Sequence, residues 1–371
     1  MKKSSILKYF IALAVILGLG ALSLYLSVGD EFSSVVDALL SVKPGYLCVM
    51  LLLMIGYYII DGRIMQVISR QYNKDYTLKQ GFVNNMVGIF FSDLTPSATG
   101  GQFAQVYVFR HQGISGTCAS GILIMALISY QIVIIAYAAI SIFLQAPLVF
   151  SGGVGTWIIA VVGFAVNIGV TVVLFFGSTS KRVQKFILEL CIGGLAKIHI
   201  VKDYDKTSKE IKGVFREFRH NSKELFANKK LFYNTLFLNA LKLTMLYSIP
   251  FFAFLSVGAN LEIGQFPVLL ALASAVTMFN TFMPIPGASG GSEGSYMLLY
   301  SYLGGYLASS SMLIWRVITF YFGLIMGAVI LIVSKDVRGY RGQESVQEDI
   351  EEIKDLEEKE ELKEKELKEK E

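Results

Sequence analysis

Between two long apolar runs the chain reads Phe282-Met-Pro-Ile-Pro-Gly-Ala-Ser-Gly-Gly-Ser-Glu-Gly-Ser295. These prolines and glycines stand where a helix crossing the hydrocarbon core of a membrane would have to continue. A helix broken at that depth must satisfy its freed N–H and C=O groups inside protein or in a wet cavity. The stretch also carries a carboxylate, Glu293, and an ionisable side chain within a membrane is a functional candidate.

A second interruption repeats this pattern earlier in the chain. Residues 96–101 read Pro-Ser-Ala-Thr-Gly-Gly, and residues 286–291 read Pro-Gly-Ala-Ser-Gly-Gly. Both fit the motif Pro-x-Ala-[Ser/Thr]-Gly-Gly, and 190 residues separate the two copies. Two broken segments at corresponding places in two halves of a chain point to the substrate site of a transporter.

The composition indicates a polytopic membrane protein. Of 371 residues, 54% are hydrophobic and only 17% are charged, whereas soluble domains are about one quarter charged. We expect a transmembrane domain over 1–342, with a basic cytoplasmic insertion at 178–230, and then a charged cytoplasmic tail over 343–371. From Glu344 onward, 14 acidic residues against 6 lysines give the tail a net charge of −8, so the rest of the chain carries +12.

Charges in the connecting segments predict which side each one faces, because basic loops face the cytoplasm. Residues 61–80 and 178–230 are basic, whereas 145–155 carries no charge. Both termini are then cytoplasmic, and the helix predicted at 9–28 is a retained anchor. The apolar segments lie at 9–28, 45–60, 81–95, 117–144, 156–177, 231–257, 266–283, 296–308 and 312–334.

These assignments leave two segments that must enter and leave on the same side. Segment 81–116 returns to the cytoplasm after turning at Pro96–Gly101, and segment 266–310 returns to the outside after turning at Pro284–Gly291. We therefore predict an all-α polytopic fold of about six spanning helices plus two re-entrant helical hairpins in an inverted repeat.

Within the basic insertion, Lys206–Arg219 has the spacing of an amphipathic helix. Ile211, Val214, Phe215 and Phe218 recur at i, i+3, i+4 and i+7, which places them on one face. Such a helix suits an anionic membrane surface. It equally suits a cytosolic helix packed on the transmembrane body.

The two motif copies have the chemistry of an anion site. Proline ends the incoming helix, glycine permits positive φ, and a helix restarting near Gly101 or Gly291 directs unpaired N–H groups at the turn. If the turns meet, an anionic head group such as a lipid phosphate would fit between them. The alternative is that the small residues only allow close helix packing. The polar side chains expected there are Ser97, Thr99, Gln102, Gln105, Ser289, Ser292 and Glu293.

Four further ionisable residues fall in or beside apolar runs: Lys242, Arg316, Asp93 and Arg110. A buried charge needs a partner or a wet cavity. We hypothesise that Lys242 or Arg316 pairs with Glu293 and that the other contacts an anionic substrate. Alternatively, Arg316 extends to the outer interface and Asp93 lies at the inner one.

The sequence predicts no metal site, cofactor or catalytic residue. Cys48, Cys118 and Cys191 are scattered and lack a histidine at ligand spacing, so we interpret them as small buried side chains.

Two stretches resemble the signature regions of the lysylphosphatidylglycerol synthase transmembrane (flippase-like) family. They are Phe91–Tyr107, which reads FSDLTPSATGGQFAQVY, and Met283–Gly294, which reads MPIPGASGGSEG. Gln102 and Gln105 stand where many relatives carry an acidic residue and an arginine. The resemblance implies a protein of the bacterial plasma membrane that handles a phospholipid or lipid-linked anionic head group. The best-understood members of that family translocate aminoacylated phosphatidylglycerol and thereby lower sensitivity to cationic antimicrobial peptides. The candidate substrate-binding set is Asp93, Pro96, Ser97, Thr99, Gly100, Gly101, Gln102, Gln105, Arg110, Lys242, Pro286, Ser289, Gly290, Gly291, Ser292, Glu293 and Arg316.

The same resemblance supplies an enzymatic alternative, a phosphatidylglycerol lysyltransferase that uses lysyl-tRNA, or its membrane subunit. Bifunctional members carry a cytosolic C-terminal domain for that step, and here only 37 residues follow Ser334, too few for an independent core. We expect the chain by itself to bind phospholipid and no nucleic acid, and synthase activity to need a separate partner protein. A third reading is a non-transporting scaffold. The sequence leaves the oligomeric state open.

Overall fold

The structure is a computed structural model that describes residues 32–95, 98–144, 153–184, 204–280, 285–334 and 337. Over these ranges the chain forms helices and no strand. The predicted helix at 9–28, the tail at 343–371, and Pro96 and Ser97 lie outside the described residues.

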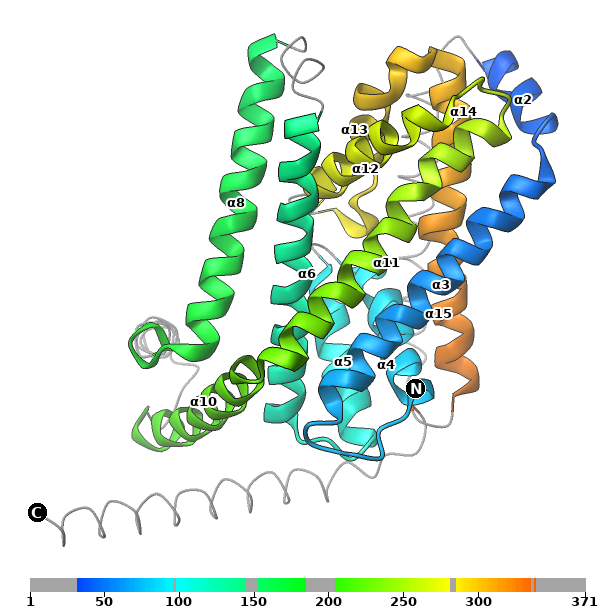
Figure 1. Cartoon of the computed structure of the whole chain (residues 1–371). Helices are drawn as coiled ribbons and strands as arrows, with labels where there is room; N and C mark the ends of the chain where they lie inside the picture. The colour runs from blue at the N-terminus through cyan, green and yellow to red at the C-terminus, as the bar shows by residue number, and fades with distance from the viewer. Residues whose placement is uncertain are drawn as a thin grey trace, which may run out of the picture.

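The first half of the bundle is a long helix, a hairpin and a second long helix. The long helices run in opposite directions, and the hairpin between them opens at the lower end in Figure 1. Thr77 begins the hairpin with a capping box, in which its side chain accepts a hydrogen bond from the backbone N–H of Gln80. In order, the elements are α3 (Pro44–Ser69), α4 (Leu78–Leu94), α5 (Thr99–His111) and α6 (Gly116–Leu144), with α2 (Phe32–Leu40) before them.

The second half repeats this order in the opposite orientation. Its first helix rises, its hairpin opens at the upper end, and its last helix descends (Figure 1). That last helix contains a π-helical turn, η6 (Val317–Tyr321). The elements are α11 (Lys229–Ser256), α12 (Phe266–Asn280), α13 (Gly291–Tyr300), α14 (Gly305–Arg316) and α15 (Phe322–Val333), with short 3-10 turns η3 (Ile263–Gln265), η4 (Pro286–Ala288) and η5 (Ser301–Leu303).

Helices α8 (Gly153–Thr179) and α10 (Tyr204–Ala227) connect the halves. The predicted amphipathic helix is confirmed as part of α10, which packs against α6 and α8. Glu217 and Leu225 of α10 are buried, and the Thr117 hydroxyl of α6 donates a hydrogen bond to the Glu217 carboxylate. These contacts fit the packed alternative, and Arg216 and Lys223 are exposed.

The described residues include five helices long and apolar enough to cross a membrane. Four coincide with predicted crossings: Pro44–Ser69, Gly116–Ser141, Lys229–Ser256 and Gly305–Val333. The fifth, Ile263–Asn280, contains the first arm of the second hairpin. Helix α8 occupies the crossing predicted at 156–177.

Two predicted boundaries are wrong. Segment 61–80 is not all loop, because α3 continues to Ser69. The second hairpin also ends earlier than predicted, because α13 stops at Tyr300 and the crossing helix begins at Gly305 rather than 312. Gly304 has a φ of +116°, a conformation that glycine adopts without steric cost.

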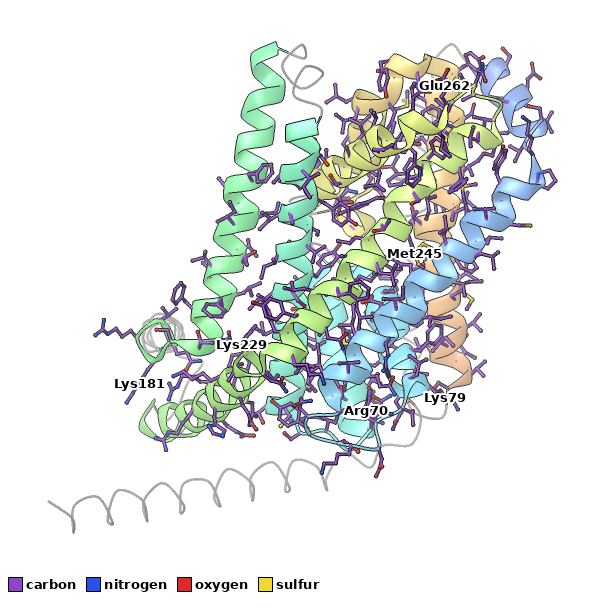
Figure 2. The ribbon with its side chains drawn as sticks, viewed as in Figure 1. Arg70, Lys79, Lys181, Lys229, Met245 and Glu262 are labelled. Atoms are coloured by element: carbon purple, nitrogen blue, oxygen red, sulfur yellow. The ribbon has the colours of Figure 1, made fainter. Side chains whose placement is uncertain are left out.

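Charge is unevenly distributed between the two ends of the bundle. Arg70, Lys79, Lys181 and Lys229 lie toward the lower end in Figure 2, and Glu262 lies at the upper end. The lower end, where the first hairpin opens, is therefore the basic one.

Glycines allow α3 and α4 to approach closely in the first half. A Cβ on Gly81 of α4 would overlap the carbonyl oxygen of Gly62 on α3, and a Cβ on Gly62 would lie 2.8 Å from the Phe82 Cα. The two backbones touch here, so the first hairpin is held directly against α3.

We therefore expect Gly81→Ala to lower stability, because the added methyl group forces α3 and α4 apart. Overpacking of this kind costs about 1–3 kcal/mol. Gly169→Ala in α8 is the matched control, since nothing lies within 4 Å of its Cβ position. Thermal unfolding of the detergent-solubilised protein measures both, and equal midpoints for the two variants would contradict the close crossing.

Candidate functional site

The two motif copies have the same unusual backbone. Ala98 has a φ of 54° and Ala288 a φ of 50°, and they are the only non-glycine residues with positive φ among those the structure describes. Left-handed backbone costs an alanine roughly 1–2 kcal/mol, so a surrounding constraint must hold each turn. Both alanines line one cavity, so the two turns border the same space.

Each turn leads into a helix whose first N–H groups are partly satisfied locally. Helix α5 begins at Thr99, two residues earlier than predicted, and α13 begins at Gly291 as predicted. The Gly100 N–H donates to the Thr95 hydroxyl at 2.8 Å. The Gly290 N–H donates to the Glu293 carboxylate at 2.7 Å. The remaining first-turn N–H groups still give each turn a partial positive charge.

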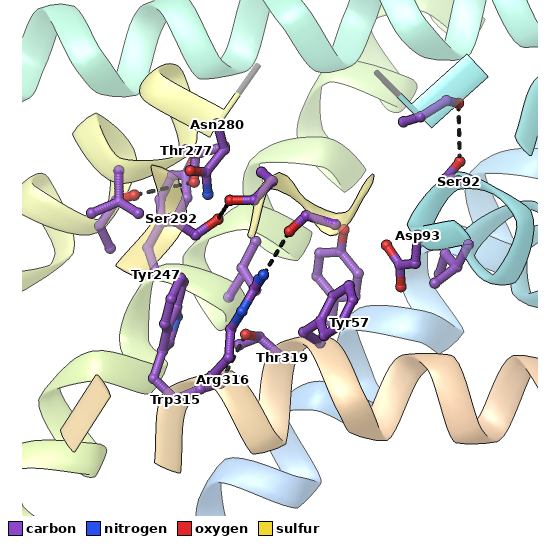
Figure 3. Close-up of a pocket in the computed structure, with 18 of the residues that line it drawn as sticks. Tyr57, Ser92, Asp93, Tyr247, Thr277, Asn280, Ser292, Trp315, Arg316 and Thr319 are labelled. Atoms are coloured by element: carbon purple, nitrogen blue, oxygen red, sulfur yellow. Dashed lines mark hydrogen bonds between the residues drawn. The ribbon is translucent and has the colours of Figure 1, made fainter. Parts of the chain in front are cut away.

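The cavity has a volume of about 560 Å³ and takes its walls from both halves of the bundle. Aromatic and polar side chains dominate the part shown in Figure 3, where Asp93 of α4 and Arg316 at the end of α14 both project into the space. Its polar and aromatic lining includes Tyr57, Tyr58, Ser92, Asp93, Thr99, Gln102, Tyr130, Gln131, Tyr247, Thr277, Asn280, Ser292, Tyr296, Trp315, Arg316, Thr319 and Phe320.

Arg316, the last residue of α14, holds the second turn. Its Nε donates to Glu293 Oε1 at 2.8 Å, and its Nη2 donates to the Gly287 carbonyl at 2.6 Å and to the Ser289 hydroxyl at 3.2 Å. Arg316 is 6% exposed and Glu293 1%. A buried pair of this kind is stable only when further hydrogen bonds satisfy its remaining donors and acceptors, as they do here.

The ring of Phe320 completes this contact. It lies 4.3 Å from the guanidinium carbon of Arg316, within the range of a cation–π interaction. A Cβ on Gly287 would overlap that ring, so glycine is required there both for space and for its φ of +60°. The Nη1 of Arg316 makes no hydrogen bond within the described part of the chain, so its two N–H groups remain available in the cavity wall.

Asp93 has a different environment. Its side chain lines the cavity and makes no hydrogen bond or ion pair to any other described residue. Among the described lining residues, buried atoms without a hydrogen-bond partner include the Tyr58 hydroxyl, Gln131 Oε1 and Asn280 Oδ1. Buried polar atoms are normally satisfied, so the cavity is suited to a polar ligand.

Lys242 pairs with a residue that the sequence analysis missed. Its Nζ donates to Asp61 Oδ1 at 2.7 Å and lies 4.6 Å from the Tyr130 ring and 5.5 Å from the Tyr57 ring. Of the two pairings considered for Glu293, the structure therefore shows the one with Arg316. Lys242 is not among the residues that line the cavity, and its contact with an anionic substrate stays a prediction. The sequence offered one signal for Asp61: it is a charged residue that directly follows the apolar run 45–60.

Other predicted residues lie elsewhere. Gln105 is buried beside Gly88. Its backbone carbonyl accepts a hydrogen bond from Asn84 Nδ2 at 3.0 Å. Arg110 lies beside Gly116 at the far end of α5.

The first Gly-Gly fits the packing alternative. A Cβ on Gly101 would overlap the Ser92 hydroxyl, and one on Gly100 would lie 2.6 Å from Thr95 Cγ2. In the second turn, Ser292 lines the cavity, whereas Pro286, Ser289, Gly290 and Gly291 form the turn around Arg316 without lining the cavity.

Glu293→Gln should destabilise the second turn, because it leaves the buried guanidinium of Arg316 without a counter-charge. Breaking a buried pair costs about 3–5 kcal/mol, and thermal unfolding in detergent measures the loss. Glu262→Gln, which alters an exposed carboxylate, is the matched control. The double replacement Glu293→Leu/Arg316→Met should recover part of the stability; a Glu293→Gln midpoint equal to that of the control would contradict the role of the pair.

The sequence of the chain matches a known protein family. The family model for the lysylphosphatidylglycerol synthase TM region matches residues 9–327. This range includes both hairpins and the residues that line the cavity. No curated protein sequence matches the chain.

Proposed function

The chain belongs to the family of the lysylphosphatidylglycerol synthase TM region, and from this premise we propose that it binds and translocates a phospholipid with an anionic head group, of the aminoacyl-phosphatidylglycerol type. One observation carries the proposal: both motif turns line a single cavity, with Arg316 and Asp93 on its walls. Long apolar helices make the chain a multi-pass membrane protein.

In this proposal the hairpins α4–α5 and α12–α13 are re-entrant and belong to an inverted repeat with six crossings. Their opposite orientation (Figure 1) and the matching φ angles of Ala98 and Ala288 support it. Broken backbone at membrane depth is tolerated where it lines a cavity. The basic lower end of the bundle faces the cytoplasm, and the membrane is the bacterial plasma membrane.

The phosphate of the head group is assigned to the side of Arg316. The Nη1 of this residue has donors without a described partner, and guanidinium groups bind phosphate with directional, charge-assisted hydrogen bonds. The amino-terminal ends of α5 and α13 add partial positive charge. Glu293 balances the single positive charge of Arg316, so this ion pair by itself leaves the site without net charge.

The amine of an aminoacyl group is assigned to the side of Asp93. Its carboxylate has no described partner, and Tyr57, Tyr58 and Tyr130 line the same cavity. A carboxylate together with aromatic faces binds an ammonium group by charge and by cation–π attraction. The site therefore offers separate places for a negative and a positive group of one head group.

The cavity's size limits what it holds. Sites of about 300–1,000 Å³ accommodate small molecules, and 560 Å³ lies within that range. It suits a head group and not a whole phospholipid, whose acyl chains then remain in the bilayer while the head group crosses.

We expect Asp93→Asn and Arg316→Lys each to slow translocation by about tenfold or more, equivalent to about 1.4 kcal/mol. Asparagine removes the charge that holds the amine, and lysine keeps the charge of Arg316 but loses Nη1. The measurement is the loss of dithionite accessibility of fluorescently labelled lysyl-phosphatidylglycerol in vesicles containing the purified full-length protein.

Lys79→Gln, an exposed change at the basic end, is the control and should leave the rate unchanged. Wild-type rates in both site variants would contradict the proposed site. Radiolabelled lysyl-tRNA added to phosphatidylglycerol vesicles tests the enzymatic alternative, and label in the lipid would favour that alternative.

A further inference from the structure

One face of α5 is exposed over most of its length. The exposed residues are spaced three or four apart, which places them on one side of the helix, and they are Thr99, Gln102, Phe103 and Tyr107. We call these four residues the α5 stripe. At the turn the stripe is part of the cavity wall, because Thr99 and Gln102 line the cavity. From there α5 runs to the lower, basic end of the bundle (Figure 1). The stripe therefore connects the cavity with that end.

The stripe is too polar to face acyl chains. Gln102 is exposed and makes no hydrogen bond to any other described residue. An amide transferred to an apolar medium without a partner costs roughly 2–7 kcal/mol. On α8, in contrast, every exposed residue described between 163 and 179 is apolar, Val173 among them. A polar groove continuous with the cavity satisfies the amide of Gln102, whereas hydrocarbon does not.

The equivalent face of the second hairpin is packed. The two motif copies lie 190 residues apart, so Gln102 and Phe103 correspond to Ser292 and Glu293. Phe103 is 79% exposed, whereas Ser292 is 0% and Glu293 1% exposed. Helix α14 covers this second face, because its Arg316 binds Glu293. The face beside the cavity is thus open on the first hairpin and closed on the second.

We propose that a phospholipid of the cytoplasmic leaflet enters the cavity along the α5 stripe, with its head group on the stripe and its acyl chains in the bilayer. The proposal rests on the proposed function and adds to it the place and side of entry. The stripe is about 12 Å long at 1.5 Å per residue. Arg70 and Lys79 at the basic end (Figure 2) concentrate anionic head groups near its start.

The unequal hairpins then have a simple meaning. Transporters built from inverted repeats alternate between two states, in which one repeat moves against the other around a fixed site. An exposed stripe on the first hairpin and a packed face on the second correspond to the state open to the cytoplasm. In the opposite state the face that includes Ser292 and Glu293 opens, and the α5 stripe is covered.

The test is the reactivity of single added cysteines in the full-length protein, in inverted membrane vesicles whose cytoplasmic face is outside. Maleimides react with the thiolate, which forms in water and not among acyl chains. A charged, membrane-impermeant maleimide should therefore label Phe103→Cys about tenfold faster, or more, than Val173→Cys of α8, although Val173 is also exposed, at 62%. Tyr107→Cys supplies a second position on the stripe. Labelling is counted above that of the unsubstituted chain, which keeps its native cysteines.

Equally slow labelling of both stripe positions and of Val173→Cys would overturn the proposal. Acyl chains, residues 9–28 or a second copy of the chain would then cover the stripe. Faster labelling of Phe103→Cys in intact spheroplasts than in inverted vesicles would overturn the side of entry.

A second measurement separates a route from a merely wet surface. Phe103→Cys is reacted with the maleimide before reconstitution and should then lose translocation of fluorescently labelled lysyl-phosphatidylglycerol, because the attached group blocks the stripe. Lys223→Cys, an exposed position on α10, is labelled in the same way and should keep its rate. An unchanged rate for labelled Phe103→Cys would overturn the route. Absence of translocation by the unsubstituted chain would refute the proposed function, whereas translocation with an unreactive stripe would refute this proposal alone.

Discussion

The arrangement of the cavity depends on the need to satisfy a guanidinium group in the protein interior. Arg316 meets that need with Glu293, the Gly287 carbonyl and the Ser289 hydroxyl, so a single side chain of α14 fixes the whole second turn. The turn holds Ala288 in a strained backbone region, and strain of this kind persists only where surrounding contacts over-determine it. The wall of the cavity and the ion pair are thus one structural unit.

The two turns share a backbone but differ in how they are held. In the first, the hydroxyl of Thr95 accepts the Gly100 N–H, and the glycines pack against α4. In the second, the charged Glu293 accepts the Gly290 N–H and also binds Arg316. The motif therefore specifies the shape of a turn, while the residues around it decide its electrostatics. Asp93 and Arg316 give the cavity one acidic and one basic lining residue.

Local chemistry explains what could be predicted from the sequence. Proline and glycine interrupt a helix wherever they occur, so both hairpin turns were predictable, and the buried Arg316 required a carboxylate such as Glu293. The partner of Lys242 was not predictable, because Asp61 lies 181 residues away on a helix that continues into what the charges indicated as a loop. The left-handed alanines were also beyond prediction, since nothing in an alanine favours that backbone.

The π-helical turn at Val317–Tyr321 limits how the length of this helix can vary. A helix turns about 100° per residue, so the one extra residue in this turn sets the rotation of α15 relative to α14. Before this turn in the sequence, Arg316 must face Glu293. After it, Gly323 must face Tyr58 and Gly327 must face Met86, each at contact distance. Deleting one residue here would leave the helix intact but would rotate α15 relative to α14, so one of these two sets of contacts would be lost. We therefore expect this short stretch not to tolerate insertions or deletions.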